Sequence, residues 1–333
     1  MWVIDFSSLQ LIRPIGEGSY GRVYLGLWRE CPVAVKILLS AGLDAANESD
    51  AMQQAISLSH PVLANLQKEA ALMSAMRHAN IVQFFGFCTA PPCVVTEYCS
   101  KGSLTEILRA ARRTPPIAAK LNWPRRLSML LDCAKGMLYL HCHSPPIIHR
   151  DLKTPNLLVT SDWHVRVSDF NLSKILESTA VLSSAQATNP RWLAPEVLKA
   201  QPATQHSDVY SFGVIMWELL TWEVPYARQS HWEVINDITA GRRLPVPAPE
   251  ELPGRGSGAF AGLPTYTKLM RMCWAAVPEE RPPFQEVVQV LKWLLPLAVK
   301  KADGVSPGRQ PNGAGGSILD DDDTTWPPES AGE

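Results

Sequence analysis

The sequence lacks the cysteine spacing of a disulfide-rich or zinc-binding protein. Its seven cysteines are scattered, their number is odd, and no two of them are separated by only two residues. Such usage indicates reduced thiols in the cytoplasm, with the nucleus as the alternative. The run His141-Cys142-His143 has no second pair of ligands at zinc spacing, so we expect no metal to bind there.

Long apolar runs are also missing. No stretch reaches the roughly 18 apolar residues that a bilayer crossing needs, and the N-terminal residues do not place a charged segment before an apolar one. These absences exclude a transmembrane helix and a secretory signal peptide. We therefore expect a soluble cytoplasmic protein that does not span a membrane.

The chain has little net charge. Its 31 Lys and Arg residues nearly balance its 32 Asp and Glu residues, which leaves −1. Residues 301–333 carry two basic and seven acidic side chains, so the rest of the chain has a surplus of only +4. This surplus is too small for a nucleic-acid-binding surface, and we expect no nucleic-acid partner.

The periodicity of apolar residues changes along the chain. Strand-like alternation comes first, interrupted by one helical pattern, and helical spacing dominates after residue 103. Strand patterns occupy residues 9–37, 81–87, 93–98, 157–159 and 165–167. Helical patterns occupy residues 66–76, 127–140 and 208–293.

These patterns predict an α+β fold in one domain, residues 1–298. A small β-rich lobe of about 1–97 is followed by a hinge of about 97–102 and a mostly helical lobe of about 103–298. The Ala-, Ser- and Asn-rich residues 39–66 fit neither period and are interpreted as a long insert, disordered or used for docking. Residues 299–333, rich in Gly, Pro, Ser and Asp, are predicted to be a disordered acidic tail or an acidic regulatory segment.

The first motif with chemical content is rich in glycine. A strand-like pattern follows it, so the glycines are expected in a β-hairpin and not in the strand-to-helix turn of a dinucleotide-binding fold. Glycines in a hairpin let backbone N–H groups approach phosphates without obstruction by side chains. The motif residues are Gly16, Glu17, Gly18, Ser19 and Gly21.

A single lysine interrupts the apolar strand pattern of residues 33–36. A charge inside such a strand is costly unless it is paired. Glu69, on the helix predicted at residues 66–76, is the best candidate partner. Because the glycine hairpin precedes it, Lys36 is expected to bind phosphate.

Residues 149–156 read His-Arg-Asp-Leu-Lys-Thr-Pro-Asn, between a helical pattern and a short strand. This spacing is highly specific. Asp151 is expected to orient an attacking hydroxyl and accept its proton, and Asn156 to bind magnesium. Asp169, which begins Asp-Phe-Asn, is the expected second magnesium ligand, because Mg²⁺ favours few carboxylates together with phosphate oxygens.

A glutamate closes the segment that begins at Asp169. Glu196 stands in Ala194-Pro195-Glu196 and needs a buried partner if it lies in the core. Arg281, in Glu280-Arg281-Pro282, is the predicted partner.

Together these motifs resemble the signature set of protein kinases, in the same order and structural contexts. The resemblance covers residues 9–298, and within kinases it is similar to the tyrosine-kinase-like group, particularly Raf-like and mixed-lineage serine/threonine kinases. The runs that carry it are residues 149–159, 188–196, 208–213 and 273–274, with Arg281-Pro282. It implies a bilobal fold, ATP and Mg²⁺ as cofactors with Mn²⁺ as an alternative, and a protein substrate. It leaves the oligomeric state open.

The resemblance also implies roles for individual residues. Asp208 is expected to anchor the catalytic loop, and Thr96 to be the gatekeeper before a hinge of Glu97–Cys99 that meets adenine. The residues expected to sandwich the adenine ring are Val23, Ala34 and Leu158. Those expected to form a stacked regulatory column are Met73, Phe84, His149 and Phe170; all of these also suit plain core packing.

Lys153 carries the prediction of substrate specificity. In the family, a lysine two residues after the catalytic aspartate, together with Thr188 in the following segment, goes with serine and threonine as acceptors. The group includes dual-specificity members, so tyrosine stays open as an additional acceptor.

Two features depart from the family pattern. Asn171 replaces a glycine that the family nearly always has, and asparagine is among the few other residues that tolerate a positive φ. We expect this change to bias an activity switch. The connection from Lys36 to Glu69 is longer than usual for the family, and Glu69 is assigned from the helical pattern that follows it at residues 72–76. Both departures leave a pseudokinase scaffold, which binds nucleotide or partners without turnover, as the alternative function.

Regulation is expected to act through Arg150. A buried cation beside Asp151 needs an anion, and phosphorylation of the segment after Asp169 by an upstream kinase would supply one. The candidate acceptors are Ser178, Thr179, Ser183 and Ser184.

Overall fold

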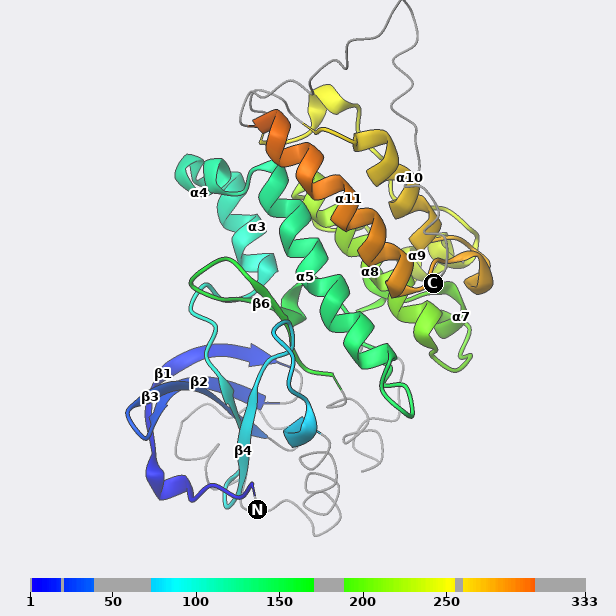
Figure 1. The fold of residues 1–333 in the computed structure, drawn as a ribbon. Helices are drawn as coiled ribbons and strands as arrows, with labels where there is room; N and C mark the ends of the chain where they lie inside the picture. Colours follow the sequence, from blue (N-terminus) through cyan, green and yellow to red (C-terminus); the bar gives the residue numbers. More distant parts are fainter. Residues whose placement is uncertain (1, 19–20, 39–72, 171–188, 255–259, 303–333) are drawn as a thin grey trace, which may run out of the picture.

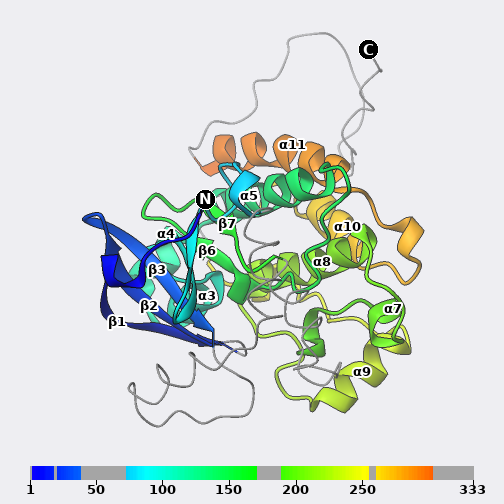
Figure 2. The same cartoon turned by 90° about the horizontal axis from the view of Figure 1, so that it is seen from below.

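The computed structural model describes residues 2–18, 21–38, 73–170, 189–254 and 260–302 (Figure 1). A β-sheet lies at one end and the long helices lie at the other, which is the predicted bilobal α+β arrangement (Figures 1 and 2). The strands are β1 (Leu9–Gly18), β2 (Gly21–Trp28), β3 (Cys31–Leu38), β4 (Phe84–Thr89), β5 (Pro92–Glu97), β6 (Leu157–Val159) and β7 (Val165–Val167). The helices are α3 (Leu104–Arg113), α4 (Pro115–Lys120), α5 (Trp123–His141), α7 (Pro195–Leu198), α8 (Gln205–Thr221), α9 (His231–Thr239), α10 (Leu263–Cys273) and α11 (Phe284–Ala302).

The small lobe is built on an antiparallel sheet in the order β1-β2-β3-β5-β4. Alternation in β3 points Val33, Val35 and Ile37 into a core with Val95 of β5, where each is nearly inaccessible to water. Branched side chains at every second position suit this half-buried sheet. The strand patterns read from the sequence are therefore confirmed, with ends that shift by a few residues.

The large lobe is organised around two buried helices. Asn122 directly precedes α5, and its side chain accepts a hydrogen bond from the backbone N–H of Arg125 at 3.0 Å and so caps the helix. α8 is buried along almost its whole length. Figure 2 shows α11 lying along α5 at one face of the lobe, where it shields α5 from solvent.

α11 continues through Ala302, beyond the predicted end of the domain at residue 298. It contains Pro296, which normally disrupts a helix by removing one backbone donor. Leu294 and Ala298 are buried on either side of this proline. The buried apolar face holds the helix together, and periodicity around a proline does not reveal such packing. The domain limits stay predictions.

The two lobes are joined by backbone hydrogen bonds. Val82 N–H donates to Val167 C=O of β7, and Val167 N–H donates to Asn80 C=O, both at 2.9 Å. Gly136 lets α5 approach this junction, because a Cβ at this position would lie 2.6 Å from the carbonyl oxygen of Asn80. The small lobe is thus attached to the β6–β7 hairpin that follows the expected catalytic loop.

Candidate active site

The loop of residues 149–156 connects α5 to β6 and is hydrogen-bonded to α8. Asp208, fully buried near the start of α8, accepts backbone N–H bonds from His149 at 2.8 Å and from Arg150 at 3.0 Å. Its Oδ2 also lies 2.9 Å from Nε2 of His141 at the end of α5. Arg150 has a positive φ of 67°, a conformation that costs energy in a non-glycine residue. The anchoring contacts expected for Asp208 are present, and they offset this strain.

Three polar side chains expected in catalysis meet in this loop. Asp151 Oδ2 lies 2.8 Å from Nζ of Lys153 and accepts a hydrogen bond from Nδ2 of Asn156 at 3.0 Å. Asn156 Nδ2 also donates to the backbone oxygen of Asp151 at 2.8 Å. The Asp151 carboxylate is therefore held in one orientation by a charged and a neutral donor.

The two expected metal ligands flank neighbouring strands: Asn156 directly precedes β6, and Asp169 follows β7. Ser168, directly before Asp169, donates both its backbone N–H and its hydroxyl to the carbonyl oxygen of Asn156, each at 2.9 Å. His149 adds a contact of 3.0 Å from Nε2 to the carbonyl oxygen of Ser168. The β6–β7 pairing thus brings Asn156 and Asp169 to one side of the catalytic loop.

Asp169 links the large lobe to the small lobe. Its Oδ1 lies 2.8 Å from Nζ of Lys36 on β3. Burial opposes ionisation of Asp169, but the charge and hydrogen bond of Lys36 outweigh this effect and hold the pKa of the carboxyl below its ordinary value. A carboxylate that stays ionised, next to a cation able to bind phosphate, suits a nucleotide phosphate site.

The register of the sheet places the expected nucleotide-binding residues side by side. Gly18 pairs with Gly21 at the tip of the β1–β2 hairpin, as the sequence predicts for this motif. Val23 of β2 pairs with Lys36, and Ala34 pairs with Thr96 of β5. Gly16 and Glu17 lie on β1 of the same hairpin, and Glu17 forms an ion pair of 3.6 Å with Arg22.

The expected hinge leads from β5 to α3 and is hydrogen-bonded to β6. Cys99 C=O accepts from Gly102 N–H at 3.1 Å, and Gly102 C=O accepts from Val159 N–H at 2.9 Å. The Cys99 thiol is buried, which raises its pKa to about 12. Leu158, the middle residue of β6, pairs with Ser103 in an isolated antiparallel bridge.

Glu97 uses its side chain for structure. Its carboxylate contacts Nε of Arg166 at 3.0 Å and accepts from the backbone N–H of Gln83 at 2.8 Å. Burial raises its pKa, while the Gln83 bond and the Arg166 charge act in the opposite direction. A contact from Glu97 to a nucleotide would therefore come from its backbone.

The predicted Glu196–Arg281 ion pair is present. Arg281 Nη1 and Nη2 lie 2.6 and 2.9 Å from the two oxygens of Glu196, in a bidentate arrangement between buried side chains. Burial opposes ionisation of Glu196, but the Arg281 bond leaves the carboxyl pKa below its ordinary value. This pair attaches α7, at the end of the segment that starts at Asp169, to the loop before α11.

Several expected residues lie outside the described residues. The proposed Lys36–Glu69 pair, the Asn171 departure and the role of Thr188 therefore stay predictions. The members of the expected regulatory column, by contrast, are all described and all buried, and Met73, Phe84 and Phe170 share one core. The expected residues outside the description are Ser19, Glu69, Asn171, Thr188 and the acceptors Ser178, Thr179, Ser183 and Ser184.

Two charged residues with clear structural roles were missed by sequence analysis. Arg166 joins β7 to the hinge through Glu97, and Glu218 accepts hydrogen bonds from two other segments inside the large lobe. Neither belongs to a spaced motif. The available signal for Glu218 is a single carboxylate within an apolar helical run.

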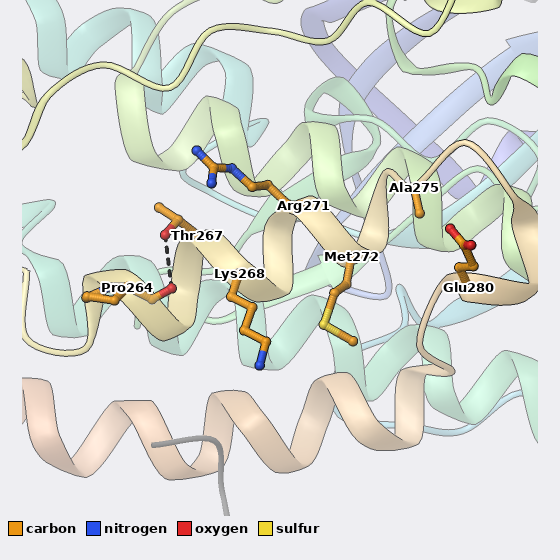
Figure 3. A pocket seen from close by; sticks show the side chains of 7 residues that line it. All are labelled: Pro264, Thr267, Lys268, Arg271, Met272, Ala275 and Glu280. Atoms are coloured by element: carbon orange, nitrogen blue, oxygen red, sulfur yellow. Dashed lines mark hydrogen bonds between the residues drawn. The ribbon is translucent and has the colours of Figure 1, made fainter. Parts of the chain in front are cut away.

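A surface groove of about 540 Å³ lies along the outer side of α10 (Figure 3). Lys268 and Met272 extend from one side of the helix and Arg271 and Thr267 from the other, while Glu280 approaches from the following loop. None of the expected site residues lines this groove. In the part of the chain that the structure describes, no helix has the length and apolarity to cross a membrane.

Comparison with known proteins shows the family. The family model "Protein tyrosine and serine/threonine kinase" matches residues 9–291. The chain is 38% identical over 311 residues to the probable serine/threonine-protein kinase drkD of Dictyostelium discoideum, covering 92% of this chain and 21% of that protein. It is 38% identical over 299 residues to the serine/threonine-protein kinase CTR1 of Arabidopsis thaliana, covering 89% of this chain and 33% of that protein.

The chain belongs to the protein tyrosine and serine/threonine kinase family. It spans only about a fifth to a third of the length of these two relatives. Protein kinases use ATP and a divalent metal, and they act on protein substrates.

The residues present fit such a metal. Because the amide nitrogen of Asn156 faces Asp151, its amide oxygen, the atom that binds metal, is turned away from Asp151. Asp169 supplies an oxygen on a carboxyl whose pKa is lowered. One amide oxygen and one carboxylate suit a hard cation that takes its other ligands from phosphate and water.

Replacing Lys36 with methionine is expected to lower kcat/KM for phosphate transfer by about 10²–10³-fold, because it removes the charged donor that is expected to bind phosphate. The change also removes the Lys36–Asp169 ion pair. Steady-state kinetics of protein phosphorylation would measure the loss. Lys120→Met, at an exposed position at the end of α4, is the control. Equal activities of the two variants would contradict the role of Lys36.

Proposed function

We propose that the chain is an active serine/threonine protein kinase that transfers the γ-phosphate of Mg-ATP to a protein hydroxyl. The observation that carries the proposal is the Asp151 carboxylate, oriented by Asn156 and paired with Lys153 at 2.8 Å. The relatives drkD and CTR1 carry serine/threonine kinase in their names, which supports the same acceptor.

In the proposed reaction, Asp151 orients the substrate hydroxyl and receives its proton. The hydroxyl oxygen forms a bond to the γ-phosphorus while the bond between that phosphorus and the β–γ bridging oxygen breaks, and ADP leaves with that oxygen. Lys153, beside Asp151, is placed to stabilise charge on the transferred group. Lys36 and the glycine hairpin position the phosphates. Asn156 and Asp169 would hold the metal, which would supply positive charge against the phosphates; we propose Mg²⁺, with Mn²⁺ as the alternative.

Domain limits and regulation form part of the proposal. We propose a catalytic domain of residues 1–298, with lobes of about 1–97 and 103–298 joined by a hinge at about 97–102. Arg150 is exposed, so the expectation of a buried cation that needs an anion is wrong. We propose instead that an upstream kinase phosphorylates the segment after Asp169 and that the added phosphate binds the exposed Arg150 side chain. All seven cysteines are described and none forms a disulfide, which supports a reducing compartment such as the cytoplasm.

A pseudokinase scaffold is the second candidate, because Asn171 replaces glycine after the Asp169-Phe170 pair. Phosphoamino-acid analysis after transfer of labelled γ-phosphate to a generic basic protein separates the two candidates. We expect phosphoserine and phosphothreonine from the wild-type chain, and more of both from Asn171→Gly. Phosphotyrosine alone would contradict the proposed specificity. If neither form transfers label while both bind nucleotide, the scaffold is the correct function.

A further inference from the structure

A second carboxylate lies inside α8, and the mechanism above does not use it. Glu218 is only 3% exposed on a helix whose other inward side chains are mostly apolar. Burial raises the pKa of its carboxyl to about 8, against the opposing effects of hydrogen bonds from Trp192 and Thr154 and of the Arg109 charge. Since this pKa lies above the unfolded value, the stability contribution is full below about pH 4.5 and is lost as the pH rises to 8. Simple packing would favour an apolar residue here.

Glu218 connects two segments that are far apart in the sequence. Its Oε1 accepts from the hydroxyl of Thr154 at 2.8 Å, and its Oε2 accepts from the indole N–H of Trp192 at 2.7 Å. Thr154 follows Lys153 in the catalytic loop, and Trp192 ends the short 3₁₀ helix Pro190–Trp192. The carbonyl oxygen of Trp192 also accepts from Ser211 of α8 at 2.7 Å, so this tryptophan is attached to the helix at two points.

The direction of the hydrogen bonds follows from the donors available. When Glu218 is ionised, Thr154 gives its one hydroxyl proton to the carboxylate. Its oxygen also lies 2.7 Å from the hydroxyl oxygen of Thr105 on α3, so Thr105 is the donor in that contact. One chain of hydrogen bonds therefore runs from α3 through the catalytic loop and Glu218 to Trp192, in which Thr154, Glu218 and Trp192 are buried and Thr105 is half-buried.

We infer that Glu218 is a positioning residue that holds the catalytic loop at Thr154 and the 190–192 segment at Trp192 in a fixed relation for phosphate transfer to a protein. This inference rests on the proposed kinase function. Because Thr154 is adjacent to Lys153, which pairs with Asp151, a shift at Thr154 moves the pair that faces the accepting hydroxyl. The residues proposed to contact adenine and the phosphates lie on other elements, and only the proposed metal ligand Asn156 shares the 3₁₀ helix of Thr154.

Glu218→Leu, which keeps the volume and removes both acceptors, is expected to lower kcat for a protein substrate by about tenfold or more, with KM for ATP unchanged. Glu218→Gln is expected to retain most of the wild-type kcat. Its amide oxygen can accept from Trp192, and its amide N–H can donate to Thr154, which then donates to Thr105. If kcat falls as far in Glu218→Gln as in Glu218→Leu, the positioning role is wrong. The same holds if the main effect of Glu218→Leu is a higher KM for ATP.

A second measurement does not depend on activity or on Glu218→Leu folding. Trp192→Phe removes the indole donor together with part of the ring. Trp217→Phe is the matched control, because it loses the same ring atoms and a bond of the same length from α8, from its indole to Pro245 C=O at 2.7 Å. Hydrogen exchange is expected to accelerate at residues 153–157 as well as 190–193 in Trp192→Phe, and at neither segment in Trp217→Phe. Exchange that changes only at 190–193 would overturn the coupling. If hydrogen exchange accelerates at both segments but the wild-type chain transfers no phosphate, the coupling through Glu218 stands and only the proposed kinase function is contradicted.

Discussion

Replacing Asp151 with asparagine is expected to lower kcat for protein phosphorylation by about 10²–10⁴-fold, the usual contribution of a general base. The amide cannot receive the proton of the attacking hydroxyl. It also removes the anion that pairs with Lys153 at 2.8 Å. The shape of the side chain is preserved, so the fold and the nucleotide affinity are expected to remain those of the wild type.

The matched control for this change is Asp162→Asn, at an exposed position in the β6–β7 turn. Labelled phosphate transfer measures kcat, while thermal unfolding and nucleotide titration verify that each variant is folded and binds ATP. An Asp151→Asn variant that keeps more than about a tenth of wild-type kcat would rule out Asp151 as the base.

Replacing Arg281 with alanine is expected to lower the free energy of unfolding by about 3–5 kcal/mol, because it leaves a buried carboxylate without its counter-ion. Arg281 is 2% exposed and contacts both oxygens of Glu196. It also donates to the carbonyl oxygens of His206 and Ala275, each at 3.0 Å. Urea denaturation of the two proteins measures the difference.

An exposed ion pair in the same lobe provides the comparison. Arg112 and Glu223 are 2.7 Å apart with nearly half of each side chain accessible to water, so Arg112→Ala is expected to change stability by less than about 1 kcal/mol. The Arg281→Ala,Glu196→Ala double variant is expected to lose less than the sum of the two single variants. Equal losses from Arg281→Ala and Arg112→Ala would show that burial does not decide the strength of the pair.

The sequence predicted the bilobal fold well, because the period at which apolar residues recur shows which face of a strand or helix is buried. Alternation along β3 and the helical spacing within α5 both correspond to buried faces. The end of α11 was harder to predict, since Pro296 interrupts a helix that packing against α5 maintains. Such stabilisation comes from residues distant in sequence, which a local pattern does not contain.

The candidate site residues likewise divide into those that the sequence predicted and those that it did not. Asp208 and the Glu196–Arg281 pair were expected from motifs, and their contacts are present. Glu218 and Arg166 were not expected, because their partners come from segments that only the tertiary fold brings together. A charged residue in an apolar run indicates that a partner exists, but the sequence alone does not identify it.

The most direct test of the proposed kinase function is the amount of labelled γ-phosphate that the wild-type chain transfers from Mg-ATP to protein serine and threonine, per molecule that binds nucleotide. We predict many turnovers per molecule, with the label on serine and threonine. A folded chain whose site is saturated with nucleotide but transfers no label, with or without Asn171→Gly, would contradict the account and leave a nucleotide-binding scaffold.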